Sequence, residues 1–328
     1  MIMGVSGSEG AGKLEELRSE LNELKKQRNA VILAHNYQRP EVQDIADFVG
    51  DSLGLSISAS KTTRDMILFC GVDFMAETAK VLNPEKKVLI PDIRSRCPMA
   101  MMLNVETLRS AKRLNPEADV IMYINTHADV KTECDCICTS ANAPEIVNHS
   151  SKDAVLFGPD VNLSYYVQKR TSKQIITVPE RGNCPTHHQI SLEEVLLSKE
   201  ENPDAVILAH PECIPQIQDR ADVIASTEGM IKYVKSSKKR EFIIATEVGV
   251  VHRLRKENPG RIFIPASEYA VCPNMKMHTL DKMVRALRDG KPEIILPDEV
   301  IEKARAPLDK MLSISAKLQS KLSLNKNT

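Results

Sequence analysis

Three cysteines, each followed directly by a proline, recur at nearly constant spacing along this chain of 328 residues. They are Cys97, Cys184 and Cys272, which stand 87 and 88 residues apart. Three thiolates that meet at one point can hold a [4Fe-4S] cluster whose fourth iron stays open and acts as a Lewis acid on a substrate oxygen. The same thiolates can instead hold a zinc ion that keeps one water. Both metal centres are favoured over three buried structural cysteines, because packing alone rarely places three thiols in register.

Three sets of polar residues recur in the same register as the cysteines. They are His35, Tyr123 and His210; Tyr37, Asn125 and Glu212, two residues further on; and the hydroxyl residues Ser52, Ser140 and Thr227. The first two sets follow apolar segments, at the strand ends where open α/β sheets bind ligands, and both can face one crevice only if the second set lies in loops. Each hydroxyl precedes an expected helix. It either caps that helix or binds, together with the helix N–H groups, a carboxylate or phosphate. Three hydroxyls in register favour a shared anion site.

Two adjacent histidines, His187 and His188, follow Cys184 and have no counterpart in the other copies of the pattern. Residues that occur in only one copy of the repeat, next to a metal centre, are candidate functional groups. A histidine that supports a metal ligand from behind, or one that lies on the surface, fits the pattern equally well.

The other five cysteines receive a structural interpretation. By the repeat, Cys134, Cys136 and Cys138 align with small or apolar residues of the other copies, namely Ala46, Phe48 and Gly50, and Ala221, Val223 and Ala225. Since free cysteine behaves as a small hydrophobe, we predict a buried strand face for them and burial for Cys70. Cys213 is expected to line the pocket beside Glu212 without binding metal.

The elements that position these residues come from an internal repeat. Ala-Val-Ile-Leu-Ala-His at 30–35 returns identically at 205–210, and Asp-Val-Ile-Met-Tyr at 119–123 fills the same slot between them. A second apolar segment recurs at 66–70, 154–158 and 242–246, and a third at 88–91, 175–179 and 261–265. Short apolar runs separated by helical periodicity are typical of parallel sheets covered by helices. We therefore predict an α/β fold of three successive three-layer units with right-handed crossovers, packed around a pseudo-threefold axis.

Additions at both ends complete the predicted organisation. Leucines at 14, 17, 21 and 24 predict an amphipathic outer helix over 14–28. The end from Ser313 has few large apolar residues, and residues 324–328 are expected to fray. The predicted boundaries are 1–28 for a tail and a helix packed on the first unit, 29–104, 105–191 and 192–275 for the three units, and 276–328 for C-terminal helices and the frayed end.

Composition excludes several classes of function. Lys and Arg together number 44, as do Asp and Glu, so no global field recruits nucleic acid or an anionic membrane. The start lacks a cationic segment followed by an apolar one, and no stretch approaches the roughly 18 apolar residues of a membrane span. We therefore expect a cytoplasmic protein. Its eight cysteines are then not a disulfide framework, because a reducing compartment keeps thiols free.

Nine short motifs, in order, carry a family resemblance. They are Ala-His-Asn-Tyr-Gln at 34–38, Gly-Asp-Ser at 50–52, Cys-Pro-Met-Ala at 97–100, Tyr-Ile-Asn-Thr at 123–126, Thr-Ser-Ala-Asn-Ala at 139–143, Cys-Pro-Thr-His at 184–187, His-Pro-Glu-Cys at 210–213, Ser-Thr-Glu-Gly-Met at 226–230 and Cys-Pro-Asn-Met at 272–275. From about Lys13 to Leu312, the chain resembles the quinolinate synthase family. The resemblance implies three Rossmann-like αβα domains around a pseudo-threefold axis, with a single [4Fe-4S] cluster on Cys97, Cys184 and Cys272 at their junction.

The resemblance also implies substrates and roles. The family condenses iminosuccinate (iminoaspartate) with dihydroxyacetone phosphate, losing phosphate and two waters, to give quinolinate for de novo NAD synthesis. A functional link to an enzyme that produces iminoaspartate follows. The positions that match the family's dicarboxylate and phosphate site are His35, Ser52, Tyr123, Asn125, Ser140, His210, Glu212 and Thr227. We expect Tyr37 and Glu212 to transfer protons, with His187 as a third candidate. The strip from Cys134 to Cys138 departs from the family pattern.

Two rival functions remain at this stage. A non-enzymatic iron–sulfur sensor or electron carrier would bind a cluster on the same cysteines, but a sensor has no need of polar sets lining one crevice, and a carrier normally completes its cluster with a fourth protein ligand. A zinc hydro-lyase is the rival within the enzyme class.

Overall fold

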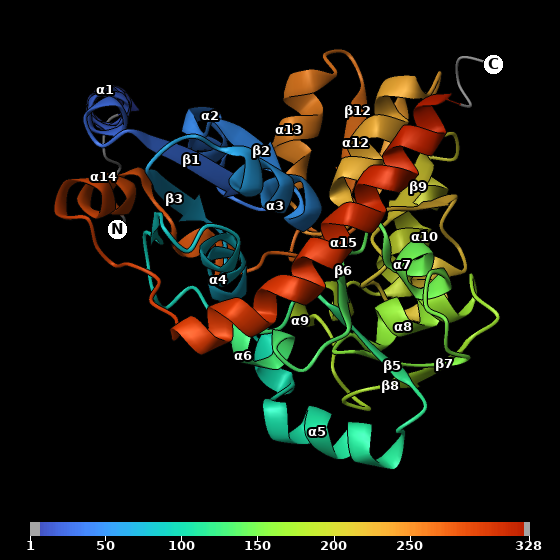
Figure 1. The fold of residues 1–328 in the computed structure, drawn as a ribbon. Helices are drawn as coiled ribbons and strands as arrows, with labels where there is room; N and C mark the ends of the chain where they lie inside the picture. The colour runs from blue at the N-terminus through green and yellow to red at the C-terminus, as the bar shows by residue number, and fades with distance from the viewer. Residues whose placement is uncertain (1–6, 325–328) are drawn as a thin grey trace.

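The computed structural model describes residues 7–324 and the side-chain environments of residues 12–318. After the helix α1 (Gly7–Gln27), three units follow, each with a four-stranded parallel sheet flanked by helices (Figure 1). The strand orders are β2-β1-β3-β4, β6-β5-β7-β8 and β10-β9-β11-β12, so the same topology occurs three times. This arrangement confirms the predicted α/β fold of three Rossmann-like αβα units.

The three predicted strands of each unit are present with nearly the predicted bounds. They are β1 (Ala30–His35), β3 (Met66–Cys70) and β4 (Lys87–Leu89); β5 (Asp119–Tyr123), β7 (Ala154–Gly158) and β8 (Gln174–Thr177); and β9 (Val206–Ala209), β11 (Glu241–Ala245) and β12 (Ile262–Pro265). Each sheet also has a short edge strand, which is β2 (Phe48–Gly50), β6 (Cys136–Cys138) or β10 (Val223–Ile224). With two or three residues, these edge strands are too short for a clear period in the sequence.

A repeated aspartate joins each edge strand to its neighbour. Asp47, Asp135 and Asp222 stand just before β2, β6 and β10, and each accepts the backbone N–H of a residue in the adjacent strand at 2.8 Å. The three acceptors occupy one register of the repeat, so the units share side-chain contacts as well as topology.

Helices connect the strands and cover the sheets. Those of the first unit are α2 (Pro40–Ile45), α3 (Ser52–Lys61), α4 (Asp73–Leu82) and the 3-10 turn η1 (Ala100–Met102). Those of the second are α5 (Val105–Leu114), α6 (Ala128–Lys131), α7 (Ala143–Asn148), α8 (Val161–Gln168) and α9 (Pro185–His188). Those of the third are α10 (Leu192–Glu201), α11 (Pro215–Gln218), α12 (Thr227–Ser236), α13 (Val250–Glu257) and the turn η2 (Met275–Met277).

The chain ends pack on the units as helices. As predicted, α1 is an outer helix, and it buries Leu21 beside α14 (Leu280–Asp289). The long helix α15 (Asp298–Leu324) crosses the molecule diagonally and packs on α4 of the first unit and on α6 and β6 of the second (Figure 1). Residues 325–328 of the predicted frayed end lie outside the described part of the chain. Among the described helices, none combines the length and apolar content needed to cross a bilayer.

Candidate functional site

Residues from all three units line one small cavity, of about 150 Å³, at the carboxyl ends of the strands. All thirteen residues predicted from the sequence lie on its wall: His35, Tyr37, Ser52, Cys97, Tyr123, Asn125, Ser140, Cys184, His187, His210, Glu212, Thr227 and Cys272. The structure thus brings together groups that are up to 237 residues apart in the chain. Such junctions of open α/β sheets are where ligands bind.

The three Cys-Pro cysteines reach this cavity from equivalent loops after β4, β8 and β12. Burial raises the pKa of each thiol. Repulsion from Cys272 raises the pKa of Cys97 further, and repulsion from Glu212, followed by Cys97 and Cys272, raises that of Cys184 further. Ligands of one zinc ion lie about 2.3 Å from it, so their sulfur atoms lie close together. Within the described residues these three thiols do not form a donor group whose atoms are all within 4.8 Å of one another.

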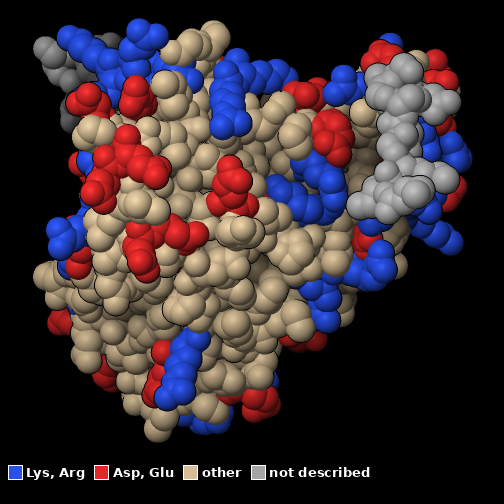
Figure 2. All heavy atoms as spheres, turned by 180° about the vertical axis from the view of Figure 1, so that it is seen from behind, with Lys and Arg blue, Asp and Glu red and all other residues tan. Residues whose placement is uncertain are grey.

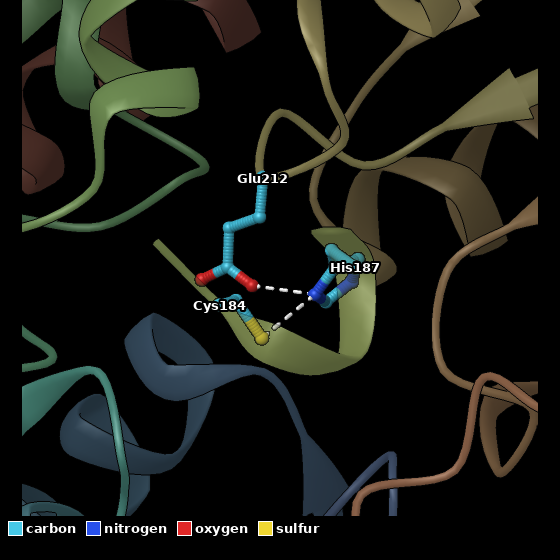
Figure 3. A group of neighbouring side chains, drawn as sticks. All are labelled: Cys184, His187 and Glu212. Atoms are coloured by element: carbon cyan, nitrogen blue, oxygen red, sulfur yellow. Dashed lines mark hydrogen bonds and ion pairs between the residues drawn. The ribbon is translucent and has the colours of Figure 1, made fainter. Parts of the chain in front are cut away.

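Glu212 is the hub of the polar network in the cavity (Figure 3). Its Oε2 lies 2.8 Å from His187 Nδ1, and its Oε1 accepts a hydrogen bond of 2.7 Å from the Tyr123 hydroxyl. Burial alone would raise the pKa of the Glu212 carboxyl, but attraction from His187 and the hydrogen bonds from His187 and Tyr123 outweigh it, so this pKa lies below its ordinary value. The carboxylate is therefore ionised although it is buried.

His187 extends this network toward Tyr37. The His187 Nε2 atom lies 2.8 Å from Thr246 Oγ1 and 3.3 Å from the Tyr37 hydroxyl, while Tyr37 and Thr246 are 2.7 Å apart. Hydrogen-bonded groups thus run from Tyr37 through His187 and Glu212 to Tyr123. Burial, followed by repulsion from Glu212, raises the pKa of both tyrosines, so both hydroxyls keep their protons. Sequence reasoning missed Thr246, because only the third unit has a hydroxyl in this slot.

The two in-register histidines present the same ring edge to the cavity. His35 Nδ1 accepts the backbone N–H of Tyr37 at 3.2 Å, and His210 Nδ1 accepts that of Glu212 at 3.3 Å. Burial lowers the pKa of both rings to about 3, so each is neutral. A neutral ring that accepts at Nδ1 carries its proton on Nε2. Each histidine therefore offers an N–H donor, and that of His210 lies 3.2 Å from Ser140 Oγ.

The three hydroxyls are not helix N-caps, contrary to one of the two interpretations given above. Ser52 and Thr227 are the first residues of α3 and α12, and the capping side chains are the preceding Asp51 and Ser226. Ser140 stands before α7, whose N-cap position is Asn142. Because neighbouring residues cap α3 and α12, the Ser52 and Thr227 hydroxyls are not used as caps. Thr227 Oγ1 accepts a hydrogen bond of 2.7 Å from the Asn36 amide and keeps its own O–H for a further partner, close to the helix N-terminus.

Two further features bear on what the cavity can bind. The Asn125 Oδ1 atom is buried and has no hydrogen-bond partner within the described residues, so it can accept a hydrogen bond from an N–H or O–H group of a ligand. No Lys or Arg of the described residues lines the cavity. An anion there would be held by hydroxyls, neutral imidazole N–H groups and helix N-termini rather than by fixed cations.

The remaining cysteines lie outside the site. Cys136 and Cys138 are buried in β6 and Cys70 in β3, as predicted, whereas Cys134 is half-buried just before β6. Cys213 does not line the cavity, and that prediction was wrong. Its thiol donates to the carbonyl of Ala245 at 3.2 Å inside the core of the third unit, because successive residues of the loop face opposite sides.

One group within the cavity has the spacing that a single metal ion requires. Cys184, His187 and Glu212 place one ligand atom each within 4.8 Å of one another. His187 Nδ1 lies 3.1 Å from Cys184 Sγ, and Figure 3 shows the three side chains converging. These residues are a possible metal-binding group.

Comparison with known proteins agrees with this site. A family model described as Quinolinate synthetase A protein matches residues 19–313. Quinolinate synthase 1 of Methanosarcina acetivorans is 51% identical over 302 residues, which cover 92% of this chain and 99% of the relative. The quinolinate synthase of Pyrococcus furiosus is 49% identical with the same coverage, and that of Methanocaldococcus jannaschii is 49% identical over 91% of this chain and 99% of its own. The chain therefore belongs to the quinolinate synthase family of enzymes.

Proposed function

We propose that this enzyme condenses iminosuccinate with dihydroxyacetone phosphate, with loss of phosphate and two waters, to form quinolinate for de novo NAD synthesis in the cytoplasm. The observation that carries the proposal is the convergence of all thirteen predicted residues on one cavity. A sensor or an electron carrier would not need this set of hydroxyl, imidazole and carboxylate groups around its metal centre. Because imines hydrolyse in water, we also propose a functional link to an enzyme that supplies iminosuccinate.

Cys97, Cys184 and Cys272 would hold a [4Fe-4S] cluster. The equivalent positions of the three thiols on the cavity wall and the absence of a fourth cysteine from the described wall support this assignment. When bound, such a cluster would supply an open iron that acts as a Lewis acid on a substrate oxygen. A single zinc ion on Cys184, His187 and Glu212 is the second candidate centre, because those three groups have the required spacing.

The polar residues would bind both substrates without a fixed cation. Hydroxyls of Ser52 and Thr227, at the first positions of α3 and α12, would join helix N–H groups in holding the phosphate or a carboxylate. The Nε2–H groups of His35 and His210 would add neutral donors, and Asn125, Ser140 and Tyr123 complete the wall. Neutral donors hold an anion and still let the phosphate product leave.

Proton transfer would run along the network centred on Glu212. As an ionised buried carboxylate, Glu212 can accept a proton from a substrate carbon or nitrogen, and Tyr37, with its raised pKa, can donate one to a leaving oxygen. His187 lies between them and can pass a proton from one ring nitrogen to the other. Tyr123 orients the Glu212 carboxylate through its hydrogen bond.

The test is anaerobic quinolinate formation from dihydroxyacetone phosphate and iminosuccinate generated in the assay. A triple Ala variant of Cys97, Cys184 and Cys272 should form no product. A triple Ala variant of Cys134, Cys136 and Cys138 removes the same number of thiols away from the cavity and should remain active. Absence of product from wild-type protein that carries a verified cluster would overturn the proposed reaction.

A further inference from the structure

Three carboxylates in one register of the repeat hold the three metal-site cysteines by their backbones. Asp73 accepts the N–H of Cys97 at 3.0 Å. Asp160 accepts that of Cys184 at 3.1 Å, and Glu247 accepts that of Cys272 at 3.1 Å. The carboxylates stand 87 residues apart in the chain, and each is buried. The contact therefore recurs once in every unit.

Each carboxylate also binds a second N–H, near the start of the next helix. The partner of Asp73 is the N–H of Phe74 in α4, at 2.9 Å, and that of Asp160 is the N–H of Leu163 in α8, at 2.7 Å. Glu247 accepts the N–H of Gly249, just before α13, at 2.7 Å. The longer Glu side chain suits this unit, where the helix begins three residues after the acid instead of at or directly after it. In every unit, one side chain ties a helix start to a cysteine loop.

The carbonyl of each cysteine is fixed as well. It accepts a backbone N–H from the short helical turn that follows: from Met101 to Cys97 at 3.2 Å, from His188 to Cys184 at 2.9 Å and from Lys276 to Cys272 at 3.2 Å. Since the residue after each cysteine is a proline without an N–H, the carboxylate and this turn hold the backbone of each cysteine on both sides.

Two of the three carboxylates lie in ion pairs at a junction between units. Asp73 is 3.4 Å from Arg96 and 3.8 Å from His127 of the second unit. Glu247 pairs with Lys276 at 2.8 Å, and Lys276 in turn donates to the carbonyl of Tyr37 in the first unit at 2.5 Å. Through these ion pairs, the positions of the Cys97 and Cys272 loops depend on how the units pack against one another around the cavity.

We propose that Asp73, Asp160 and Glu247 are positioning residues that set the three cysteine loops in their ligating arrangement before the cluster binds. This inference rests on the proposed function, because it takes Cys97, Cys184 and Cys272 as the cluster ligands. An unpaired buried N–H is costly, so a loop without its carboxylate would shift to find another partner. A shifted loop displaces its thiol. A cluster held by only three protein ligands is then bound less tightly, because one of the three is out of place.

Asp73 allows the cleanest test, because its Oδ1 accepts both N–H groups. Asp73→Asn keeps an oxygen in that place and replaces only the Oδ2 that faces Arg96 with an uncharged amide group, whereas Asp73→Ala removes both hydrogen bonds. Asp222→Ala is the matched control, because it deletes an aspartate that accepts the N–H of Ile207 at 2.8 Å and holds no cysteine. Each protein is reconstituted anaerobically and analysed for iron and sulfide per chain, visible absorption of the cluster, and the rate of iron release to a chelator. Thermal unfolding of the metal-free proteins is recorded in parallel.

We expect Asp73→Ala to release iron about 10- to 100-fold faster than wild type, with Asp73→Asn and Asp222→Ala close to wild type. Release from Asp73→Ala at the wild-type rate would overturn the inference, as would equal acceleration in Asp73→Ala and Asp222→Ala in step with their unfolding temperatures. If Asp73→Ala does not fold, Asp160→Asn replaces it, since it loses one of two acceptor oxygens and should also release iron faster. If wild-type protein takes up no cluster, the proposed function itself is contradicted. This outcome differs from failure of the inference, in which wild type binds the cluster and Asp73→Ala releases iron at the same rate.

Discussion

Glu212 connects groups from different units within one hydrogen-bonded network. Its carboxylate meets His187 and Tyr123 from the second unit, and His187 leads on to Tyr37 from the first. An ionised carboxylate in a buried cavity is costly unless it is paired, and here imidazole and phenol groups supply the pairing. Such an arrangement suits a general base next to a group that keeps its proton.

Glu212→Gln tests this role directly. The amide keeps the shape and the contact with Tyr123 but cannot accept a proton, so we expect kcat to fall about 10²- to 10⁴-fold while cluster content stays at the wild-type level. The exposed neighbour of His187 provides the control, and His188→Ala should retain full activity. The measurement is steady-state quinolinate formation with iron analysis of the same samples. A Glu212→Gln enzyme with more than half of the wild-type kcat would rule out the assigned role.

The site residues could be predicted from the sequence because they occupy equivalent positions of the repeat. The residues that this comparison missed were missed for physical reasons. Thr246 occurs in one unit only, so no comparison between units could mark it. Asp73, Asp160 and Glu247 do share a register, but they differ in type and precede helices, where acids are common for capping alone. Their contact with a cysteine N–H about 24 residues later depends on loop geometry that periodicity does not encode.

At the scale of elements, helix starts shape the anion side of the cavity. The α3 helix begins at Ser52, with Asp51 as its cap, and α12 begins at Thr227, with Ser226 as its cap; Ser226 also donates to Asp51 at 2.9 Å. This bond joins the caps of two units and holds the two hydroxyl-bearing helix starts together.

Ser52→Ala should therefore weaken substrate binding. Loss of a hydrogen bond to a charged ligand group is worth about 1.5–3 kcal/mol, so we expect KM for dihydroxyacetone phosphate to rise about 10- to 100-fold with a smaller change in kcat. Ser60→Ala, at the other end of α3, removes a hydroxyl bound to the Ile57 carbonyl and should leave KM unchanged. Equal KM values for the two variants would exclude Ser52 from the substrate site.

Lys131 illustrates how a repeated element explains an unusual residue. It is fully buried and occupies the slot of Gln43 and Gln218 in the other units. Each glutamine donates to two backbone carbonyls of the loop after the first strand and to one carbonyl of a neighbouring unit, Gly249 or Asn162. Lys131 Nζ donates to the Thr126 carbonyl of the equivalent loop. Lys131 therefore holds the conformation of this loop. The negative charge of Glu77 favours the charged form of the lysine and partly offsets the effect of burial on its pKa.

Lys131→Gln should fold and should change how stability depends on pH. Burial lowers the pKa of Lys131 to about 8, whereas an unfolded chain keeps it near 10.5. Between these values the unfolded wild-type chain binds more protons, so wild type gains stability relative to Lys131→Gln as pH rises from 8 to 10.5, by about 1–3 kcal/mol. Urea unfolding of both metal-free proteins across this range measures the difference. A constant difference would show that Lys131 titrates normally.

At the scale of the whole molecule, the three units share a continuous apolar core. The largest buried cluster includes Leu33, Phe157 and Phe242 from the three sheets and Leu308 from α15. Helix α15 adds polar contacts to two units. Arg305 donates to the carbonyls of Val81 and Leu82 in the first unit at 3.3 and 3.0 Å, and the Ser315 hydroxyl accepts from the Asn142 amide of the second unit at 2.8 Å. Figure 2 shows both acidic and basic side chains on the opposite face, around a broad area of other residues.

A shared core predicts that damage to α15 is felt by the whole chain. Leu308→Ala should lower the free energy of unfolding by about 2–5 kcal/mol within a single cooperative transition. Glu302→Ala, on the exposed side of the same helix, should change it by less than about 0.5 kcal/mol. Denaturant unfolding followed by circular dichroism measures both. A separate early transition in Leu308→Ala would show that α15 and its neighbours unfold independently of the rest.

The three units bring Cys97, Cys184 and Cys272 to one cavity, and we propose that they hold there the metal centre required for quinolinate formation. The most direct test measures the rate of quinolinate formation against cluster content in anaerobic samples reconstituted to different extents, with zinc-loaded protein alongside. We predict a rate proportional to bound cluster, reaching its maximum at about four iron per chain, and no product with zinc. A rate independent of iron, or product formed by the zinc-loaded protein, would contradict the account.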